Sequence, residues 1–192
     1  MAPDPGVVKI VTPFGRGTGL LVDDDLVVTA GHVVQAHQPV PTPTALIQII
    51  PPGGEILRPS SILCHPRWSQ GFTPAADIAV LRLATPRPDL RSPIALDSPA
   101  AQLAVTVRGF DASDVLVISA GSVTRIAHPD GYDALVSSDL RFPSGVSGAA
   151  ICDPTGTAIG LATWSPAAPA ASSFVGIPFL ALTLGWLRMN CH

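Results

Sequence analysis

Short runs of apolar and β-branched residues, each ended by Gly, Pro or Asp, recur along the whole chain. Runs of about four to eight such residues between turn residues predict β-strands. In the first half of the chain the pattern predicts strands at Val7–Thr12, Thr18–Val22, Leu26–Thr29, Ala45–Ile50, Ile56–Cys64 and Ile78–Leu83. In the second half it predicts Ala104–Gly109, Val115–Ile126 with a bend at Gly121, Ala134–Asp139, Ala149–Cys152, Thr157–Trp164 and Phe174–Ile177.

Helical periodicity is rare in this sequence. Ala30–Val34 predicts a short helical turn, and Phe179–Arg188 predicts a closing helix with Leu180, Leu184 and Leu187 on one face. The segment from His65 to Ala76 is polar, and we expect it to be a loop. The acidic turn Asp23–Asp25 joins two strands of a hairpin. We interpret it as a solvated turn rather than a metal site, because no matching ligands lie nearby in the sequence.

A proline-rich segment divides the strands into two sets. Ala84–Pro93 contains three prolines in ten residues, which cannot continue a strand ladder. We therefore predict an N-terminal lobe at residues 1–84, a linker at 85–93 and a C-terminal lobe at 94–192. About six strands on each side of the linker predict an all-β fold of two small antiparallel barrels.

Composition supports a folded, β-rich domain. The chain has 192 residues, of which 47% are apolar and 13% charged, enough for one compact unit or two small lobes with a shared core. Lys9 and Glu55 are the only residues of their types, so strong helix formers are scarce. A net charge of −3 without a basic cluster argues against nucleic acid as a partner.

The N-terminal residues and the cysteines bear on the location and redox state of the protein. The N-terminal residues 1–6 do not resemble a signal peptide, and Gly, Pro or charge interrupts every apolar run before it reaches membrane-spanning length. We therefore expect no membrane association and a cytoplasmic location, or secretion if a leader was removed. Cys64, Cys152 and Cys191 have no metal-ligand spacing and cannot form a dense disulfide framework. Reduced thiols are the simpler interpretation, although one bridge stays possible. No cofactor or metal is indicated.

Three short motifs carry candidate chemistry. Ser147 lies between Gly145 and Gly148 in Phe142–Ala150, followed by an apolar run, which suggests a nucleophile on a tight turn. His32 ends Thr-Ala-Gly-His directly after a predicted strand, and Asp77 precedes the apolar run Ile-Ala-Val-Leu. Each motif also has an ordinary interpretation, as a turn serine, a structural histidine or a strand-entry aspartate.

Taken together, these motifs resemble those of the chymotrypsin/trypsin-like serine proteases, specifically the bacterial-type branch with the HtrA-type and glutamyl endopeptidases. The order His32, Asp77, Ser147 matches, and the three lie on both sides of the linker. Supporting matches are Gly17–Val22, His65-Pro66, Gly160–Trp164 and the closing helix, so the resemblance covers about residues 7 to 188.

The resemblance implies two six-stranded antiparallel Greek-key β-barrels, a site in the cleft between them and a short C-terminal helix. It implies that His32 is the general base, that Asp77 orients its imidazole and that Ser147 attacks the substrate carbonyl to form an acyl-enzyme. The backbone N–H groups of Gly145 and Ser147 would form the oxyanion hole. Gly148 would allow close packing behind the nucleophile.

The resemblance also places a substrate pocket, but leaves its preference open. Arg141 stands at the base position; pointing inward it would favour an acidic side chain, and pointing outward it would leave a small apolar pocket of Phe142 and Ala162. We favour the second slightly, because an unpaired buried guanidinium is costly. Trp164 and Ser165 would pair with the substrate backbone. Thr163 would hydrogen-bond Asp77.

Departures from the animal members of the family concern activation. Val146 stands where they have an aspartate that receives a newly cut N-terminus, and Val33 replaces the cysteine after their histidine. Activation by N-terminal insertion is therefore not expected, and control by a regulatory domain or partner is plausible.

The sequence thus predicts a serine endopeptidase acting on a protein or peptide substrate. The alternatives are a binding or scaffold module of the same fold with little turnover, and an esterase using the same residues.

Overall fold

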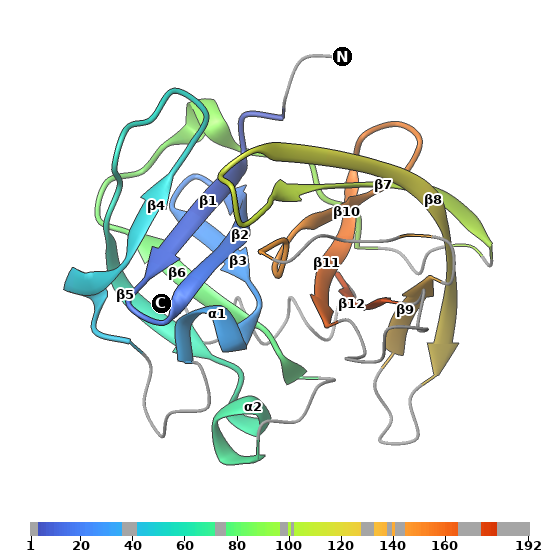
Figure 1. Ribbon diagram of the computed structural model, residues 1–192, viewed down its shortest axis with the longest axis horizontal. Coiled ribbons are helices and arrows are strands. Elements are labelled where there is room, and N and C mark those ends of the chain that lie inside the picture. Colours follow the sequence, from blue (N-terminus) through green and yellow to red (C-terminus); the bar gives the residue numbers. More distant parts are fainter. Residues whose placement is uncertain are drawn as a thin grey trace.

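The chain forms two β-sheet lobes that lie side by side, β1–β6 on the left of Figure 1 and β7–β12 on the right. The computed structural model describes residues 4–35, 42–71, 76–96, 100, 102–127, 133–137, 140, 145–164 and 174–179, with the backbone alone for residues 70, 125–127, 133–137, 164, 174 and 175. Arg141, Phe142, Ser165 and the residues of the predicted closing helix after Phe179 lie outside this part.

The N-terminal lobe is a six-stranded antiparallel sheet in the order β4-β1-β2-β3-β6-β5. Its strands are β1 (Val7–Thr12), β2 (Gly15–Asp23), β3 (Leu26–Thr29), β4 (Gln48–Ile50), β5 (Pro59–Cys64) and β6 (Ala79–Leu83). Ile49 of β4 and Leu57, just before β5, form an isolated bridge with two backbone hydrogen bonds of 3.0 and 2.8 Å. The two ends of the sheet thus meet at this bridge rather than along a full ladder.

The C-terminal lobe is a closed barrel in the order β10-β11-β12-β9-β8-β7. Its strands are β7 (Leu103–Phe110), β8 (Leu116–Ala127), β9 (Asp133–Ser137), β10 (Ala150–Cys152), β11 (Ala158–Trp164) and β12 (Phe174–Pro178). The predicted all-β architecture is confirmed. β7 and β8 pair without a register shift from Leu103↔Val123 to Phe110↔Leu116, and β8 is strongly curved along its length in Figure 1. The position of the bend, expected at Gly121, stays a prediction.

Short helices fill three connections of the N-terminal half. They are α1 (Gly31–Gln35), η1 (Thr44–Leu46) and α2 (Pro66–Gly71). The helical turn predicted after β3 is confirmed by α1. The predicted strand Ala45–Ile50 is wrong in its first part, where η1 forms and β4 begins only at Gln48.

The loop predicted over His65–Ala76 is also wrong in part, because α2 forms there (Figure 1). Pro66 suits the first position of a helix, where its missing N–H costs nothing. The carbonyl of His65 accepts hydrogen bonds from the N–H groups of Trp68 and Ser69 at 2.9 and 3.1 Å. Trp68 is buried in the core of the N-terminal lobe. Burial of this indole anchors a helix that the polar sequence around it does not predict.

The connection between the lobes is fastened to the N-terminal sheet. It contains η3 (Pro88–Leu90), and Leu90 is buried. The hydroxyl of Ser92 donates to Asp4 Oδ1 at 2.8 Å, and the Ser92 N–H donates to the Leu21 carbonyl at 2.9 Å. The predicted boundaries of the lobes and linker stay a prediction.

The acidic turn between β2 and β3 is tied into its surroundings rather than only solvated. Asp25 pairs with Arg82, and the Asp24 carbonyl accepts from the Arg87 N–H. Within the described residues, no group of His, Cys, Asp and Glu side chains could hold a metal ion, here or elsewhere.

The cores of the two lobes are continuous. One buried cluster joins β1, β2, β3 and β6 of the first lobe to β10, β11 and β12 of the second, and contains Val7, Leu20, Val22, Val28, Ile78, Val80, Ala150, Cys152, Ala158, Leu161, Ile177 and Phe179. Burying each large aliphatic side chain stabilises the fold by about 1.5–3 kcal/mol. The lobes are therefore packed against each other through an apolar interface. In the part of the chain that the structure covers, no helix is long and apolar enough to cross a bilayer.

Candidate active site

The sheet of the N-terminal lobe brings His32 and Asp77 to the same edge. His32 lies in α1, which follows β3 after Ala30, and Asp77 lies two residues before β6. β3 and β6 are antiparallel neighbours, with Thr29 paired to Ala79. The end of β3 therefore lies beside the start of β6. This register explains how two residues 45 positions apart become neighbours.

Both oxygens of the Asp77 carboxylate bind His32. Oδ2 lies 2.7 Å from the imidazole Nδ1, and Oδ1 accepts the backbone N–H of His32 at 2.8 Å. Asp77 is 2% exposed, so this pair lies largely out of water. A carboxylate at Nδ1 favours the tautomer in which Nδ1 carries the proton, which leaves Nε2 as an acceptor. The geometry therefore prepares His32 to take a proton at Nε2.

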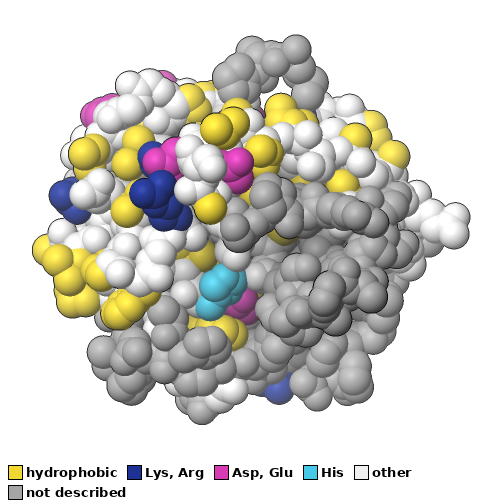
Figure 2. Space-filling model, viewed as in Figure 1, with side chains coloured by type: hydrophobic (Ala, Val, Ile, Leu, Met, Phe, Trp, Pro, Cys, Tyr) yellow, Lys and Arg dark blue, Asp and Glu magenta, His cyan; other side chains and the backbone are white. Residues whose placement is uncertain are grey.

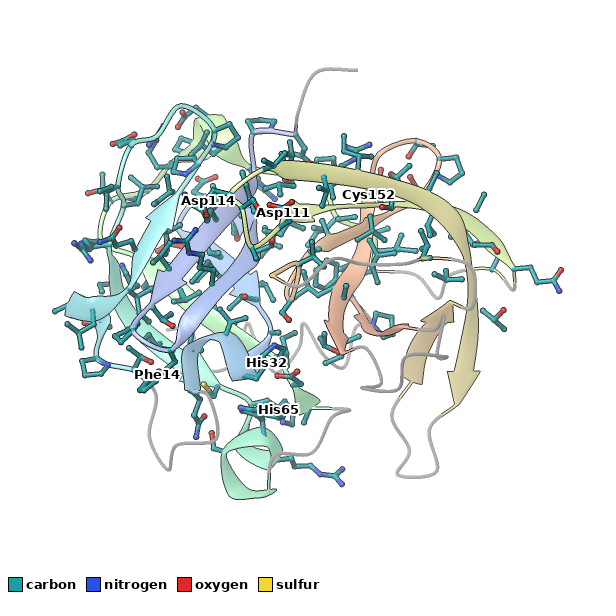
Figure 3. All side chains as sticks on the ribbon, in the orientation of Figure 1. Phe14, His32, His65, Asp111, Asp114 and Cys152 are labelled. Carbon is teal, nitrogen blue, oxygen red and sulfur yellow. The ribbon has the colours of Figure 1, made fainter. Side chains whose placement is uncertain are left out.

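His32 remains accessible from one side. Its side chain is 30% exposed, and its ring lies 6.4 Å from that of Trp68, centroid to centroid, at an interplanar angle of 59°. Figure 3 shows His32 near the boundary of the two lobes, and Figure 2 shows a histidine in a hollow of the surface at the same place. Gly31 permits the contact, since a Cβ there would lie 2.8 Å from the Trp68 indole. One side of the ring is thus packed while another faces outward.

The segment Gly145–Gly148, here called the oxyanion loop, is tied to both lobes. The Ser147 carbonyl accepts the N–H of Thr18 on β2 at 2.7 Å, across the lobe boundary. The Gly148 N–H donates to the Ala162 carbonyl of β11 at 2.6 Å. Val146 is buried in the core of the C-terminal barrel. The loop is therefore fixed between the two lobes rather than standing free.

Gly17 of β2 allows the oxyanion loop to lie close to α1. A Cβ at Gly17 would lie 2.6 Å from the Val33 side chain and 3.0 Å from the Ser147 carbonyl oxygen. The backbone of Ser147 and the residue after His32 thus pack on the same glycine. Ser147 is partly exposed, and among the described residues its hydroxyl makes no hydrogen bond, with His32 or any other group. The structure brings the two residues to one place without joining their side chains.

The glycines of the loop adopt conformations that other residues avoid. Gly145 has φ +100° and Gly148 has φ +84°, both in the left-handed region. A Cβ at Gly148 would lie 2.0 Å from the Thr18 carbonyl oxygen, so the close packing expected there is observed. Within the described part of the chain, the N–H groups of Gly145 and Ser147 donate no hydrogen bond. The loop thus keeps two neighbouring backbone N–H groups outside the hydrogen-bond network of the described residues.

Thr18 and Thr29 lie in motifs that the sequence analysis matched, but only the structure shows that they connect the two halves of the site. The Thr29 hydroxyl donates to the Thr18 carbonyl at 2.7 Å, and the Thr18 hydroxyl accepts the Phe110 N–H of β7 at 2.8 Å. Both threonines are fully buried. The one available signal was a hydroxyl inside an apolar strand, because buried polar groups are normally hydrogen-bonded.

The predicted substrate-binding residues are described only in part. Ala162 and Thr163 are buried in β11, and the Ala162 N–H donates to the Ala149 carbonyl at 2.8 Å. The backbone of Trp164 lies in β11. The hydrogen bond between Thr163 and Asp77, and the pocket roles of Arg141, Phe142 and Ser165, stay predictions.

The buried thiols are poor candidates for chemistry. Cys64 and Cys152 are both free. Burial, with a smaller effect of the Asp77 charge, raises the pKa of Cys64 to about 12. Burial raises the pKa of Cys152 to about 11. A thiol that stays protonated at neutral pH is a weak nucleophile. Cys152 therefore acts as a small apolar residue in the core between the lobes.

Comparisons with known proteins agree with this architecture. A Glu endopeptidase structure superimposes with a TM-score of 0.81 and 16% identity, over 98% of this chain and 91% of the other. The protease Anisep from Arthrobacter nicotinovorans gives 0.77 and 15%, over 96% and 94%. A scabies mite inactivated protease paralogue gives 0.71 and 16%, over 96% and 91%. At these identities the likeness shows the fold. No curated protein matches the chain in sequence.

Family membership comes from a sequence profile. The profile of the trypsin-like peptidase domain matches residues 17–161, which is most of the chain and includes His32, Asp77 and Ser147. The chain therefore belongs to the trypsin-like peptidase family, the serine-type peptidases with this two-lobed β fold.

Proposed function

We propose that this chain is a serine endopeptidase whose catalytic residues are His32, Asp77 and Ser147. The observation that carries the proposal is the His32–Asp77 pair, with a 2.7 Å contact at Nδ1 and an acceptor nitrogen left on an accessible ring. A buried carboxylate with both oxygens on one histidine is a costly arrangement, because the charge is removed from water. A role of His32 Nε2 in proton transfer explains why the chain keeps this costly pair.

In the first step Ser147 Oγ attacks the carbonyl carbon of the scissile peptide bond while His32 Nε2 takes its proton. Serine is a weak nucleophile at neutral pH and needs such a base. Asp77 stabilises the imidazolium that forms and itself stays ionised. Because Ser147 Oγ is not bonded to His32 before substrate binds, this hydrogen bond forms in the substrate complex.

The carbonyl oxygen becomes negatively charged in the tetrahedral intermediate. The N–H groups of Gly145 and Ser147 stabilise it, each contributing roughly 3–4 kcal/mol. His32 then gives its proton to the leaving amine as the C–N bond breaks, and an acyl-enzyme on Ser147 remains. Water, deprotonated by His32, then attacks the ester carbonyl. As the acyl C–O bond breaks, His32 returns the proton to Ser147 Oγ and the acid product leaves.

A second candidate is a scaffold of the same fold with little turnover. The observation that favours it is the fold likeness to an inactivated protease paralogue, which shows that this architecture exists without activity. An esterase with the same three residues differs only in the leaving group. The substrate preference of the peptidase is also a proposal. The same holds for any control of its activity by a further domain or partner.

Cleavage of a peptide library by wild type, Ser147→Ala and Ser144→Ala separates these functions. We expect cleavage by wild type and by the Ser144→Ala control, and loss with Ser147→Ala. Cleavage after small apolar residues would support the Phe142 and Ala162 pocket, and cleavage after acidic residues an inward Arg141. Intact peptides with hydrolysed esters would indicate an esterase, and neither activity a scaffold.

A further inference from the structure

The turn between β7 and β8, residues 111–115, is built as a rigid unit. Asp111 Oδ1 accepts the N–H groups of Ser113 and Val115 at 2.8 and 3.0 Å. The Asp111 N–H donates to the Val115 carbonyl at 2.9 Å, and Asp114 adopts φ +65°. Asp and Asn tolerate this left-handed conformation better than most residues. The turn therefore has a defined shape, so that a displacement of one side also moves the other side.

One side of this turn lies directly against the oxyanion loop. A Cβ at Gly145 would lie 2.6 Å from the Ala112 nitrogen and 2.8 Å from the Asp111 carbonyl carbon. The two backbones are thus in contact, with no space for a side chain between them. Any displacement of the turn toward or away from the loop changes the support of the Gly145 N–H.

The other side of the turn is held by the opposite lobe. Lys9 Nζ of β1 lies 3.2 Å from Asp114 Oδ2, and Arg16 Nη1 of β2 lies 2.8 Å from Asp114 Oδ1. The same Arg16 nitrogen donates to the Ala112 carbonyl at 3.5 Å. Figure 3 shows Asp111 and Asp114 where the β7–β8 turn reaches β1 and β2. Figure 2 shows acidic and basic side chains gathered there, next to the hollow that holds a histidine.

We propose that Asp114 is a positioning residue that braces the oxyanion loop across the two lobes. Resting on the proposed function, this inference adds that Lys9 and Arg16 hold the β7–β8 turn against Gly145. β2 then fixes the loop twice: Thr18 binds the Ser147 carbonyl, and Arg16 holds the turn behind Gly145. The Lys9 hydrogen bond, with Arg16 nearby, holds the pKa of Asp114 below its ordinary value, so the carboxylate stays charged at neutral pH.

The oxyanion loop is also packed from the side of the C-terminal barrel. Val146 is buried among apolar residues, including Val105 and Val107 of β7. The Asp4 carboxylate binds the Gly6 N–H and the Ser92 hydroxyl on the linker. The segment around Asp4 is thus tied to the linker, while Val146 anchors the oxyanion loop in the barrel core.

The test compares wild type with Asp114→Asn, which keeps a residue suited to positive φ and removes the charge. Hydrogen exchange of a peptide covering residues 145–150 should be faster in the variant. The Asp89→Asn control removes another exposed carboxylate, paired with Arg87 on the linker, and should leave this exchange unchanged. Equal exchange in wild type and Asp114→Asn would overturn the brace, whether or not the protein is an active peptidase.

Labelling by a fluorophosphonate measures the consequence for chemistry. The maximal labelling rate should fall about three- to tenfold in Asp114→Asn, as expected for two exposed ion pairs, with little change in the half-saturating probe concentration. Arg16→Gln should give a similar loss, and the double variant no more than a slight further one. Additive losses, or a change in half-saturation alone, would contradict positioning through Asp114.

Salt separates this role from a merely structural one. Raising the ionic strength from about 0.01 M to about 1 M shortens the Debye length from about 30 to 3 Å. The wild-type labelling rate should then approach that of Asp114→Asn, while the variant changes less. Equal salt dependence would reject the brace. If wild-type Ser147 is not labelled at all, the proposed function fails, and hydrogen exchange alone decides the brace.

Discussion

The N-terminal sheet supplies the candidate site with side chains, whereas the C-terminal barrel supplies it chiefly with backbone. His32 and Asp77 are fixed by bonds between ionisable side chains, one of them buried. The oxyanion loop is fixed by backbone hydrogen bonds and by glycine conformations that leave no space for a Cβ. The first half should thus be sensitive to loss of charge, and the second to added atoms.

The same contrast explains how the halves are kept in register. The apolar interface holds the two lobes together but does not fix their exact relative position, because hydrophobic burial is non-directional. Direction comes from buried polar contacts on β2, where Thr18 binds Ser147 on one side and Thr29 on the other. Catalytic geometry has to be held within a fraction of an ångström, so these few hydrogen bonds matter more than their net energies suggest.

The largest effect is expected from Asp77→Asn in the side-chain half. An amide can donate to Nδ1 and favour the wrong tautomer, so we expect peptide hydrolysis to fall about 10³- to 10⁴-fold. The thermal midpoint of the variant, measured in parallel, serves as the folding control. A folded Asp77→Asn variant with near wild-type kcat would show that the His32–Asp77 pair is structural.

A smaller loss is expected from Gly145→Ala in the backbone half. The added Cβ would meet Ala112 at 2.6 Å and strain a φ of +100°, so the N–H donor is displaced. Displacing one oxyanion donor lowers kcat about 10²- to 10³-fold. Gly156→Ala is the matched control, with φ +91° but nearest contacts of 3.6 Å, in the turn between β10 and β11. Equal losses in both variants would assign the effect to backbone strain alone.

The hydrogen bond from Thr29 to Thr18 is part of the connection between the halves. We expect the loss in Thr29→Val to be smaller than in the two variants above. This nearly isosteric change removes the donor to the Thr18 carbonyl and leaves a buried acceptor unpaired, at about 1–3 kcal/mol. We expect a lower thermal midpoint and, because Thr18 also holds Ser147, slower fluorophosphonate labelling. Thr29→Ser should restore both. If Thr29→Val loses stability but labels at the wild-type rate, the contact supports the fold without positioning the nucleophile.

The smallest effect concerns one buried thiol in each lobe, Cys64 and Cys152. Their pKa values, raised to about 12 and about 11, keep both protonated at pH 8. Iodoacetamide should therefore leave both unmodified in the native protein and modify both in guanidinium, as mass spectrometry would show. Rapid native alkylation of either thiol would mean that the lobe carrying it opens readily.

Above pH 9 the same groups give a stability prediction. Their folded pKa values exceed the ordinary value of 9.0, so the folded state binds more protons between about pH 9 and 11. Stability therefore falls as the pH rises through this window. Cys152→Ala should flatten the decline of the thermal midpoint; an unchanged slope would show that this thiol does not contribute.

The sequence predicted most strands, and the positions of His32 and Asp77 beside strands, because those signals are local. Val7–Thr12 and Leu26–Thr29 were predicted with the bounds that the structure shows. His32 and Asp77 were placed beside strands, and pairing of β3 with β6 brings them together. The runs of apolar residues, and the turn residues at their ends, are enough to predict where these strands begin and end.

What the sequence could not predict depends on partners far along the chain. Thr18 binds Phe110, 92 positions away, and Arg16 binds Ala112, 96 positions away. No periodicity encodes such pairs, and each residue alone is an ordinary strand residue. Helix α2 was missed for the same reason, because the burial of Trp68 against the folded core stabilises it.

The account rests on one dependence: Ser147 of one lobe is activated by His32 and Asp77 of the other. The most direct measurement is the rate and position of fluorophosphonate labelling, mapped by mass spectrometry, in wild type, His32→Ala and Ser147→Ala. We predict one adduct on Ser147 in wild type, much slower labelling in His32→Ala and none in Ser147→Ala. Equal labelling of wild type and Ser147→Ala, or wild-type rates in a folded His32→Ala variant, would contradict the account.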